Sequence, residues 1–285
     1  MVRTRLSCVE FGTLDAPHVI VMLAGFPDHE TSGWGDILTS LNDKDVRILC
    51  LCLPEFENNC SNRRPWGYTF DEILDLMHAT INERLGEEKR KVTLFIHDWG
   101  AYTGLLYENR YPSRVEKIVC FDVAAGISSG KSKLISPFFI VLLYQLWWAW
   151  AYFLSQAVYK PLGFAVFLSY GLLVPKFLRP TSLDKKDVPR PQNEIVVDFL
   201  YPYYTFWKQA LTSGNPKSLA PKRVSCPILF LYGLNKNVFF HNAKFLRDIE
   251  ARDDGSKYVA LDCSHWIDRG PAAATAIAEI DKFLK

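Results

Sequence analysis

Short, continuous, β-branched apolar runs recur along the first half of the chain, alternating with segments of helical periodicity. The runs lie at residues 18–23, 45–53, 91–96 and 116–122. Unbroken apolar runs of this length are typical of strands buried on both faces of a sheet. Strands that alternate with helices predict an α/β fold built on a doubly wound, mostly parallel sheet.

The alternation stops after Asp122 for about a hundred residues, then resumes with strands expected at 226–232 and 257–262. The intervening segment is rich in aromatic residues and lacks strand signals, which indicates an inserted helical cap. The expected division is a first core part, a cap and a second core part: residues 1–126, 127–220 and 221–285.

The inserted segment raises the question of a membrane, because no charged residue occurs between Lys133 and Lys160. This apolar stretch is long enough to span a bilayer, but Pro137, Gln145 and other polar residues interrupt it. We expect buried or interfacial helices of a lid rather than a membrane span. Peripheral membrane contact through the cap is a further expectation.

Charge and cysteine content narrow the class of protein. The chain has 33 Lys and Arg against 31 Asp and Glu, so no basic surface predicts a nucleic-acid partner. Its seven cysteines lack the spacing of a disulfide framework or a zinc site, and the N-terminal segment lacks the apolar run of a signal peptide. These features predict a cytoplasmic protein with no metal.

Polar stretches follow several expected strands, at the sheet edge where open α/β folds bind ligands. They are "AGFPD" at 24–28, "HDWG" at 97–100, Asp122 and "DCSHW" at 262–266. A sharp turn from strand to helix at "HDWG" would project Asp98 into a site, with the helix N-terminus favouring its carboxylate. The plainer alternative is that Asp98 only caps the helix.

These stretches, in this order and each after a strand, resemble the α/β-hydrolase superfamily, in particular its epoxide hydrolase and haloalkane dehalogenase group. The resemblance implies that Asp98 attacks an electrophilic carbon and forms an alkyl ester, which a water activated by His265 hydrolyses. It also implies an oxyanion hole formed by the backbone N–H groups of Phe26 and Trp99, and no cofactor.

The segment "YPYYTFWK" (201–208) is similar to the part of the epoxide hydrolase cap that carries a tyrosine for ring opening. The similarity puts Tyr204 in this role, with Tyr203 as the near alternative and Tyr144, Tyr152, Tyr159 and Tyr170 open for a second tyrosine. Trp99 and a cap tryptophan could instead bind a halide, and the candidates for this substrate contact are Trp147, Trp148 and Trp150.

Two departures from the group's pattern matter. After the strand at 226–232 the group has an aspartate that orients the histidine, whereas this chain has Asn235, Lys236 and Asn237. One subgroup of dehalogenases carries its acid after the preceding strand, which makes Asp122 the candidate partner of the histidine. Ile96 stands where the turn normally has a small residue, so a distorted turn is expected.

The sequence thus predicts a cofactor-independent hydrolase that converts a small apolar epoxide to a diol. A dehalogenase or ester hydrolase using Asp98 is the alternative within enzymes. A catalytically silent protein of the same fold, binding an apolar ligand or a membrane surface, is the alternative outside them.

Overall fold

The computed structural model describes residues 3–57, 60, 63–86, 90–131, 135–181, 190–213 and 219–285. A seven-stranded sheet forms its centre, in the order β1-β3-β2-β4-β5-β7-β9. The strands are β1 (Cys8–Gly12), β2 (His18–Leu23), β3 (Val46–Leu51), β4 (Val92–His97), β5 (Val115–Phe121), β7 (Ile228–Gly233) and β9 (Lys257–Leu261). All neighbours pair in parallel except β1, an antiparallel edge strand that the sequence analysis did not predict.

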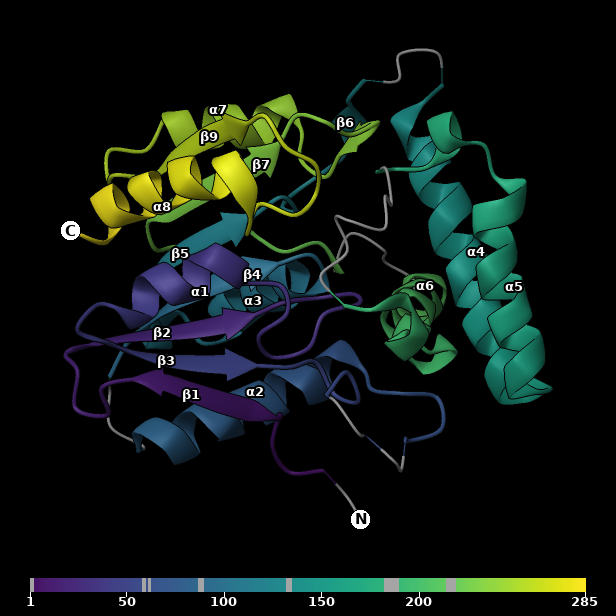
Figure 1. Ribbon diagram of the computed structural model, residues 1–285, viewed down its shortest axis with the longest axis horizontal. Helices are drawn as coiled ribbons and strands as arrows, with labels where there is room; N and C mark the ends of the chain where they lie inside the picture. Colours follow the sequence, from purple (N-terminus) through teal and green to yellow (C-terminus); the bar gives the residue numbers. More distant parts are fainter. Residues whose placement is uncertain are drawn as a thin grey trace.

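Helices cover both faces of this sheet, as predicted for a doubly wound fold (Figure 1). They are α1 (Gly35–Asn42), α2 (Phe70–Leu85), α3 (Trp99–Arg110), α7 (Ala243–Glu250) and α8 (Gly270–Leu284). Buried side chains of α1 and α8 share one apolar core, and those of α2, α3 and α7 share the other. The central strand β4 is buried along its whole length, which explains its unbroken apolar run.

Local sequence determines where some of these elements begin. Thr69 and Glu72 form a reciprocal capping box at the start of α2, in which each side chain accepts a hydrogen bond from the other residue's backbone N–H. Asn242 caps α7 by accepting a hydrogen bond from the Phe245 backbone N–H at 2.9 Å. These are local signals, so they can be read without knowledge of the tertiary structure.

Between β5 and β7 the chain leaves the sheet and forms three longer helices: α4 (Pro137–Ala157), α5 (Lys160–Leu173) and α6 (Tyr201–Thr212). We call these three helices the helical layer. They lie beyond the carboxyl ends of the parallel strands, with α5 at the outer edge (Figure 1). A two-stranded sheet of β6 (Ser128–Ser129) and β8 (Val238–Phe239) lies outside the main sheet. The predicted cap falls in this region, and its boundaries at 127 and 220 stay a prediction.

The uncharged stretch noted in the sequence is α4. Among the described residues it is the one helix long and apolar enough to cross a membrane, with a mean hydropathy of 1.5 over its most apolar window. Of this window, 44% is buried inside the protein. The buried residues of α4 include Tyr144, Trp148 and Tyr152, so one side of the helix packs on the rest of the molecule.

Candidate active site

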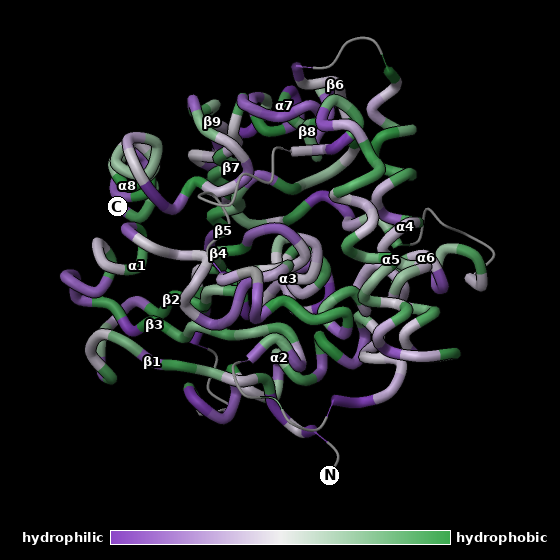
Figure 2. Tube along the Cα trace, turned by 45° about the vertical axis from the view of Figure 1, so that its right-hand side comes forward, coloured by the Kyte–Doolittle hydropathy of each residue, from purple (hydrophilic) through white to green (hydrophobic). Residues whose placement is uncertain are grey.

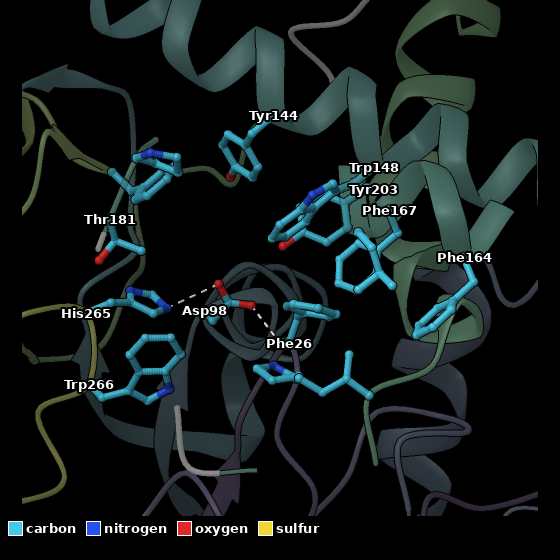
Figure 3. A pocket seen from close by; sticks show the side chains of 15 residues that line it. Phe26, Asp98, Tyr144, Trp148, Phe164, Phe167, Thr181, Tyr203, His265 and Trp266 are labelled. Atoms are coloured by element: carbon cyan, nitrogen blue, oxygen red, sulfur yellow. Dashed lines mark hydrogen bonds and ion pairs between the residues drawn. The ribbon is translucent and has the colours of Figure 1, made fainter. Parts of the chain in front are cut away.

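Asp98 lies in a tight turn between β4, which ends at His97, and α3, which begins at Trp99. Its backbone has φ 55° and ψ −127°, a strained conformation for a residue with a side chain. The Asp98 side chain makes no capping hydrogen bond to α3, so the plain reading of Asp98 as a helix cap is wrong. The turn instead points its carboxylate into a pocket (Figure 3).

Glycines make room for this turn. A Cβ on Gly25 would lie 2.3 Å from both the Asp98 Oδ1 atom and the Trp99 nitrogen, so the loop after β2 can approach only as glycine. A Cβ on Gly104 would lie 2.4 Å from Cγ2 of Ile96. The bulk of Ile96 therefore fits against a glycine of α3. β4 keeps its register with β5 from Thr93 through Ile96, and a distortion of the turn that follows stays a prediction.

Backbone N–H groups surround one oxygen of the Asp98 carboxylate. The Phe26 nitrogen donates a hydrogen bond to Oδ1 at 2.8 Å, and the nearby Trp99 backbone N–H lowers the pKa of the carboxylate. The two N–H groups named from the sequence are thus both at Asp98. Donors held in this way can stabilise a negative oxygen that forms on the same carbon.

His265 contacts both carboxylates that the sequence analysis proposed. Its Nε2 atom lies 3.4 Å from Oδ2 of Asp98, and its Nδ1 atom lies 2.5 Å from Oδ2 of Asp122. His265 comes from the loop after β9, and Asp122 follows β5 directly. The structure therefore brings together three side chains from three strand ends, although Asp122 and His265 are 143 residues apart in sequence.

Lys236 is a residue of this site that the sequence analysis did not recognise. It lies in the loop after β7, where the related group has its acid, and its Nζ atom is 2.5 Å from Oδ1 of Asp122. Both side chains are fully buried, and the Gly233 nitrogen also donates to Oδ1 at 2.9 Å. The chain thus has a cation at this position, bound to an acid from the neighbouring strand end.

We call Asp98, Asp122, Lys236 and His265 the charged cluster. A buried lysine costs free energy unless it is paired, so Lys236 requires an anion such as Asp122 nearby. If the loop after β7 had no charged residue, Asp122 would not be needed there as a counter-ion. The signal in the sequence was a lysine within an otherwise apolar and amide-rich segment, "GLNKNVFF".

Electrostatics within the cluster favour charged side chains. Burial alone would lower the pKa of His265, but the carboxylates of Asp122 and Asp98 outweigh it and raise this pKa to about 9. Burial would raise the pKa of both aspartates. Lys236 and His265 instead hold the pKa of Asp122 well below its usual range, and the hydrogen bond to His265 lowers that of Asp98.

His97 does not reach the pocket, but it contacts His265 from behind. Its Nε2 atom lies 3.1 Å from the His265 carbonyl oxygen, and the two ring centroids are 4.4 Å apart. Burial, together with the charge of His265, lowers the pKa of His97 to about 4. His97 is therefore neutral near pH 7 and holds the backbone of His265.

Asp98 and His265 form one end of a pocket of about 220 Å³ whose other walls are mostly aromatic (Figure 3). The helical layer contributes Tyr144 and Trp148 from α4, Phe167 from α5 and Tyr203 from α6. Burial raises the pKa of both tyrosines, so their phenol groups keep their protons at neutral pH. The pocket thus presents an apolar wall and two phenol groups to a carboxylate and an imidazole.

Three residues proposed for the site lie outside the pocket wall. Tyr204 packs between Trp66 and Tyr152, with ring centroids 5.4 and 5.5 Å away, so Tyr203 rather than Tyr204 faces Asp98. The Trp147 indole donates to the Val166 carbonyl at 2.9 Å, toward α5. Trp150 is 55% exposed on the outer surface. Of the three proposed tryptophans, Trp148 alone lines this pocket.

No group of three or more His, Cys, Asp or Glu residues in the described part of the chain is placed to hold a metal ion. Asp28, in the same loop after β2 as Phe26, is a buried acid. Burial and the nearby Asp268 raise its pKa to about 7. It does not line the pocket.

Comparison with known proteins identifies the family. Residues 20–278 match the model of the alpha/beta hydrolase family, so the chain belongs to this family. Among curated proteins it is similar to cis-3-alkyl-4-alkyloxetan-2-one decarboxylase of Shewanella oneidensis, 32% identical over 60 residues. It is also similar to epoxide hydrolase 1 of Caenorhabditis elegans, 28% identical over 123 residues. The matches cover 21% and 42% of this chain, but only 18% and 28% of those relatives.

Solved structures support the fold over nearly the whole chain. A mutant epoxide hydrolase from Bacillus megaterium, bound to its diol product, superposes with a TM-score of 0.63 and 17% identity. The match covers 98% of this chain and 96% of that one. Other matching structures are esterases and a lipase. At this level of identity the solved structures show the fold alone, and the comparisons leave the reaction open.

Proposed function

We propose that the protein hydrolyses an apolar epoxide to a diol through an ester on Asp98. One observation carries the proposal: a partly buried carboxylate, hydrogen-bonded at Oδ1 and facing His265 at Oδ2, forms the floor of a pocket lined by two phenol groups. The nucleophile and the proton donors that ring opening requires thus face one apolar cavity.

In the first step, Oδ2 of Asp98 attacks a ring carbon of the epoxide. A carbon–oxygen bond of the ring breaks as the new ester bond forms, and the ring oxygen takes a proton from a phenol. Tyr203 and Tyr144 are the donors in this proposal, since both line the pocket and their ring centroids are 5.9 Å apart. The product of this step is a hydroxyalkyl ester of Asp98.

In the second step, His265 takes a proton from a water molecule, which attacks the carbonyl carbon of the ester. The negative oxygen that forms is Oδ1, which already accepts the Phe26 N–H, and the adjacent Trp99 N–H is the second donor in this proposal. Collapse of this intermediate breaks the bond to the alkyl oxygen, which leaves as an alcohol with the proton from His265. The carboxylic acid of Asp98 that results contains one oxygen from water, and it gives its proton to the phenolate, which restores the carboxylate and the phenol.

Ester formation also changes the basicity of His265. The Asp98 carboxylate raises the pKa of His265 in the free enzyme, where the imidazole is charged at neutral pH. An ester has no negative charge, so this contribution disappears once Asp98 is alkylated. The pKa of His265 then falls, which favours the neutral imidazole needed to activate water.

Dehalogenation is a second candidate, favoured by one observation. Trp148 lines the pocket, and its buried indole N–H has no hydrogen-bond partner within the described part of the chain. A free buried N–H of this kind could bind a halide leaving group.

A strained oxetanone ring is a further substrate to test, because one of the curated relatives acts on this class.

The test is a single turnover in water enriched in heavy oxygen, with enzyme in excess over an aryl or long-chain alkyl epoxide. The proposal predicts unlabelled diol and one heavy oxygen in the peptide that contains Asp98. A parallel panel of haloalkane, oxetanone and ester substrates identifies the alternatives by halide, carbon dioxide or acid release. Label found in the diol and absent from Asp98 would exclude the ester mechanism.

A further inference from the structure

The outer surface of the helical layer is unusually apolar for a protein surface. Among the described residues, twelve of the seventeen exposed large apolar side chains lie between residues 138 and 177. They belong to α4, to α5 and to the segments that join or follow them. Exposed apolar residues scattered singly are ordinary, but a contiguous group of this size marks an interaction site.

We call this surface of α4 and α5 the apolar face. Helix α5 contributes its most exposed part. Leu172 is 84% exposed, Leu173 is 68% exposed and Leu168 is 50% exposed. Only Gly163 and Tyr170 are buried in this helix, and Figure 2 shows hydrophobic residues along α4 and α5, far from the sheet. One side of α5 packs on α4 and the pocket through residues such as Gly163, Phe167 and Tyr170, and the leucines near its end face outward.

The segment that carries the apolar face contains charged residues of one sign only. Residues 131–180 contain five basic residues and no acidic residue. Lys160 begins α5, and Lys176 follows its end; both are exposed, although Lys160 also pairs with Asp198. Arg179 donates hydrogen bonds to the carbonyls of Gly171 and Val174 and so holds the end of α5. An apolar surface with basic ends is complementary to an anionic lipid surface.

The apolar face is continuous with the pocket. Phe164 and Leu168 of α5 line the pocket and are 37% and 50% exposed, so they lie at its rim. In Figure 3, Phe164 is drawn at the side of the pocket opposite His265. A molecule dissolved in a lipid layer against α5 would thus meet the pocket without crossing water.

The packing of the helices excludes a membrane span and favours a helix hairpin lying on the surface. The inner side of α4 holds Tyr144 and Trp148, which line the pocket, so α4 cannot be surrounded by lipid. Helix α5 has 14 residues, fewer than the roughly 20 that cross a bilayer. Exposed Trp150 and Tyr159 are residues of the type enriched at membrane interfaces.

We propose that the apolar face of α4 and α5 docks the protein on the surface of an anionic lipid bilayer and opens the pocket toward it. The proposal goes beyond the reaction proposed above and does not depend on it, because docking is measured without a substrate.

The test is co-sedimentation of the full chain with phosphatidylcholine vesicles, with and without phosphatidylserine. Wild type should bind the vesicles that contain phosphatidylserine more strongly. Leu172→Glu should weaken binding by about tenfold or more, since it removes a leucine that the lipid would cover and adds a negative charge at the membrane. The matched control is Leu14→Glu, the same change at a leucine that is 62% exposed in the loop between β1 and β2, and it should bind as wild type does.

Any of four results would overturn the proposal. The first is no vesicle binding by wild type, and the second is equal weakening by Leu172→Glu and Leu14→Glu. The third is a stable dimer in sedimentation equilibrium that Leu172→Glu dissociates, with no vesicle binding, because the apolar face would then be covered by a second copy. Binding that does not increase with phosphatidylserine would overturn the assignment to an anionic surface. Far-ultraviolet circular dichroism of each variant checks that the fold is intact.

Discussion

The charged cluster and the helical layer meet at one pocket, but different forces hold them. Asp98, Asp122, Lys236 and His265 come from separate loops at the strand ends, and each charge has a partner of opposite sign within 3.4 Å. The helical layer presents aromatic rings held by apolar contacts, and much of its outer side has no partner within the described residues. Ion pairs and hydrogen bonds depend on direction, so they fix the positions of the groups in the charged cluster. Apolar contacts do not depend on direction, so the helical layer allows a substrate to bind in more than one orientation. Changes in the cluster should therefore have larger effects than changes in the layer.

Asp98→Asn should have the largest effect. Diol formation is expected to fall by about 10⁴-fold or more, because an amide cannot serve as the nucleophile. Asparagine tolerates the positive φ of this position, so the fold should remain intact. The measurement is initial diol formation, with Asp253→Asn at an exposed carboxylate as the matched control. Residual activity within about tenfold of wild type would place the nucleophile elsewhere.

Asp122→Asn should separate the two steps within the cluster. Ester hydrolysis is expected to slow by about 10³- to 10⁴-fold, because an amide neither orients His265 correctly nor stabilises its charged form. Ester formation should slow much less, so the alkylated enzyme accumulates and intact-protein mass spectrometry detects it. Equal slowing of both steps would argue that Asp122 has a structural role only.

Lys236→Met tests whether the pairing within the cluster is energetically coupled. The loss of one cation from a buried ion pair should lower the free energy of unfolding by about 3 kcal/mol, as measured by denaturant titration. Adding Asp122→Asn should recover most of this loss while ester hydrolysis stays slow. Lys282→Met, at a lysine that is 66% exposed, is the control and should change stability by less than about 0.5 kcal/mol. A double variant less stable than either single variant would contradict the pairing.

Tyrosine substitutions in the helical layer should have smaller effects than the substitutions in the charged cluster. Tyr203→Phe and Tyr144→Phe should each slow ester formation from an epoxide by about 10²-fold, the usual value of a general acid. Tyr204→Phe changes the neighbouring residue of α6 and should have little effect, since that ring packs against Trp66 and Tyr152. Single-turnover kinetics measure this step. A larger loss from Tyr204→Phe than from Tyr203→Phe would restore the assignment made from sequence.

The smallest expected effect concerns the protonation of His265. Its pKa of about 9 lies above the ordinary value of 6.5, so the stability that its ion pairs contribute is complete below pH 6.5 and is lost as the pH rises through 9. Removal of one carboxylate in Asp98→Asn should lower this pKa toward 6.5 and flatten the dependence of unfolding free energy on pH between these values. Titration of the imidazole by NMR gives the pKa directly. An unchanged pKa in Asp98→Asn would contradict the proposed change of basicity on ester formation.

Much of the fold and part of the site could be predicted from local patterns. Apolar runs and helical periodicity predicted the parallel strands, and the family match and the solved structures confirm the α/β hydrolase fold. The edge strand β1 was missed because it is short and only half-buried, so its sequence has no unbroken apolar run. The placement of Asp98, Asp122 and His265 at strand ends followed from the rule that parallel strands end at one edge of the sheet.

The sequence by itself determined most of the order of strands and helices and the turn at "HDWG", because these depend on local periodicity. It also placed Asp98, Asp122 and His265 at strand ends, and the resemblance to a known family implied that His265 pairs with both acids. The tertiary structure alone decided that Tyr203 rather than Tyr204 faces the pocket, since residues one apart on a helix point about 100° away from each other. It also decided that Lys236 pairs with Asp122 and that Gly104 accommodates Ile96. These contacts join residues from different elements, and no local pattern encodes which of many possible neighbours a buried side chain meets.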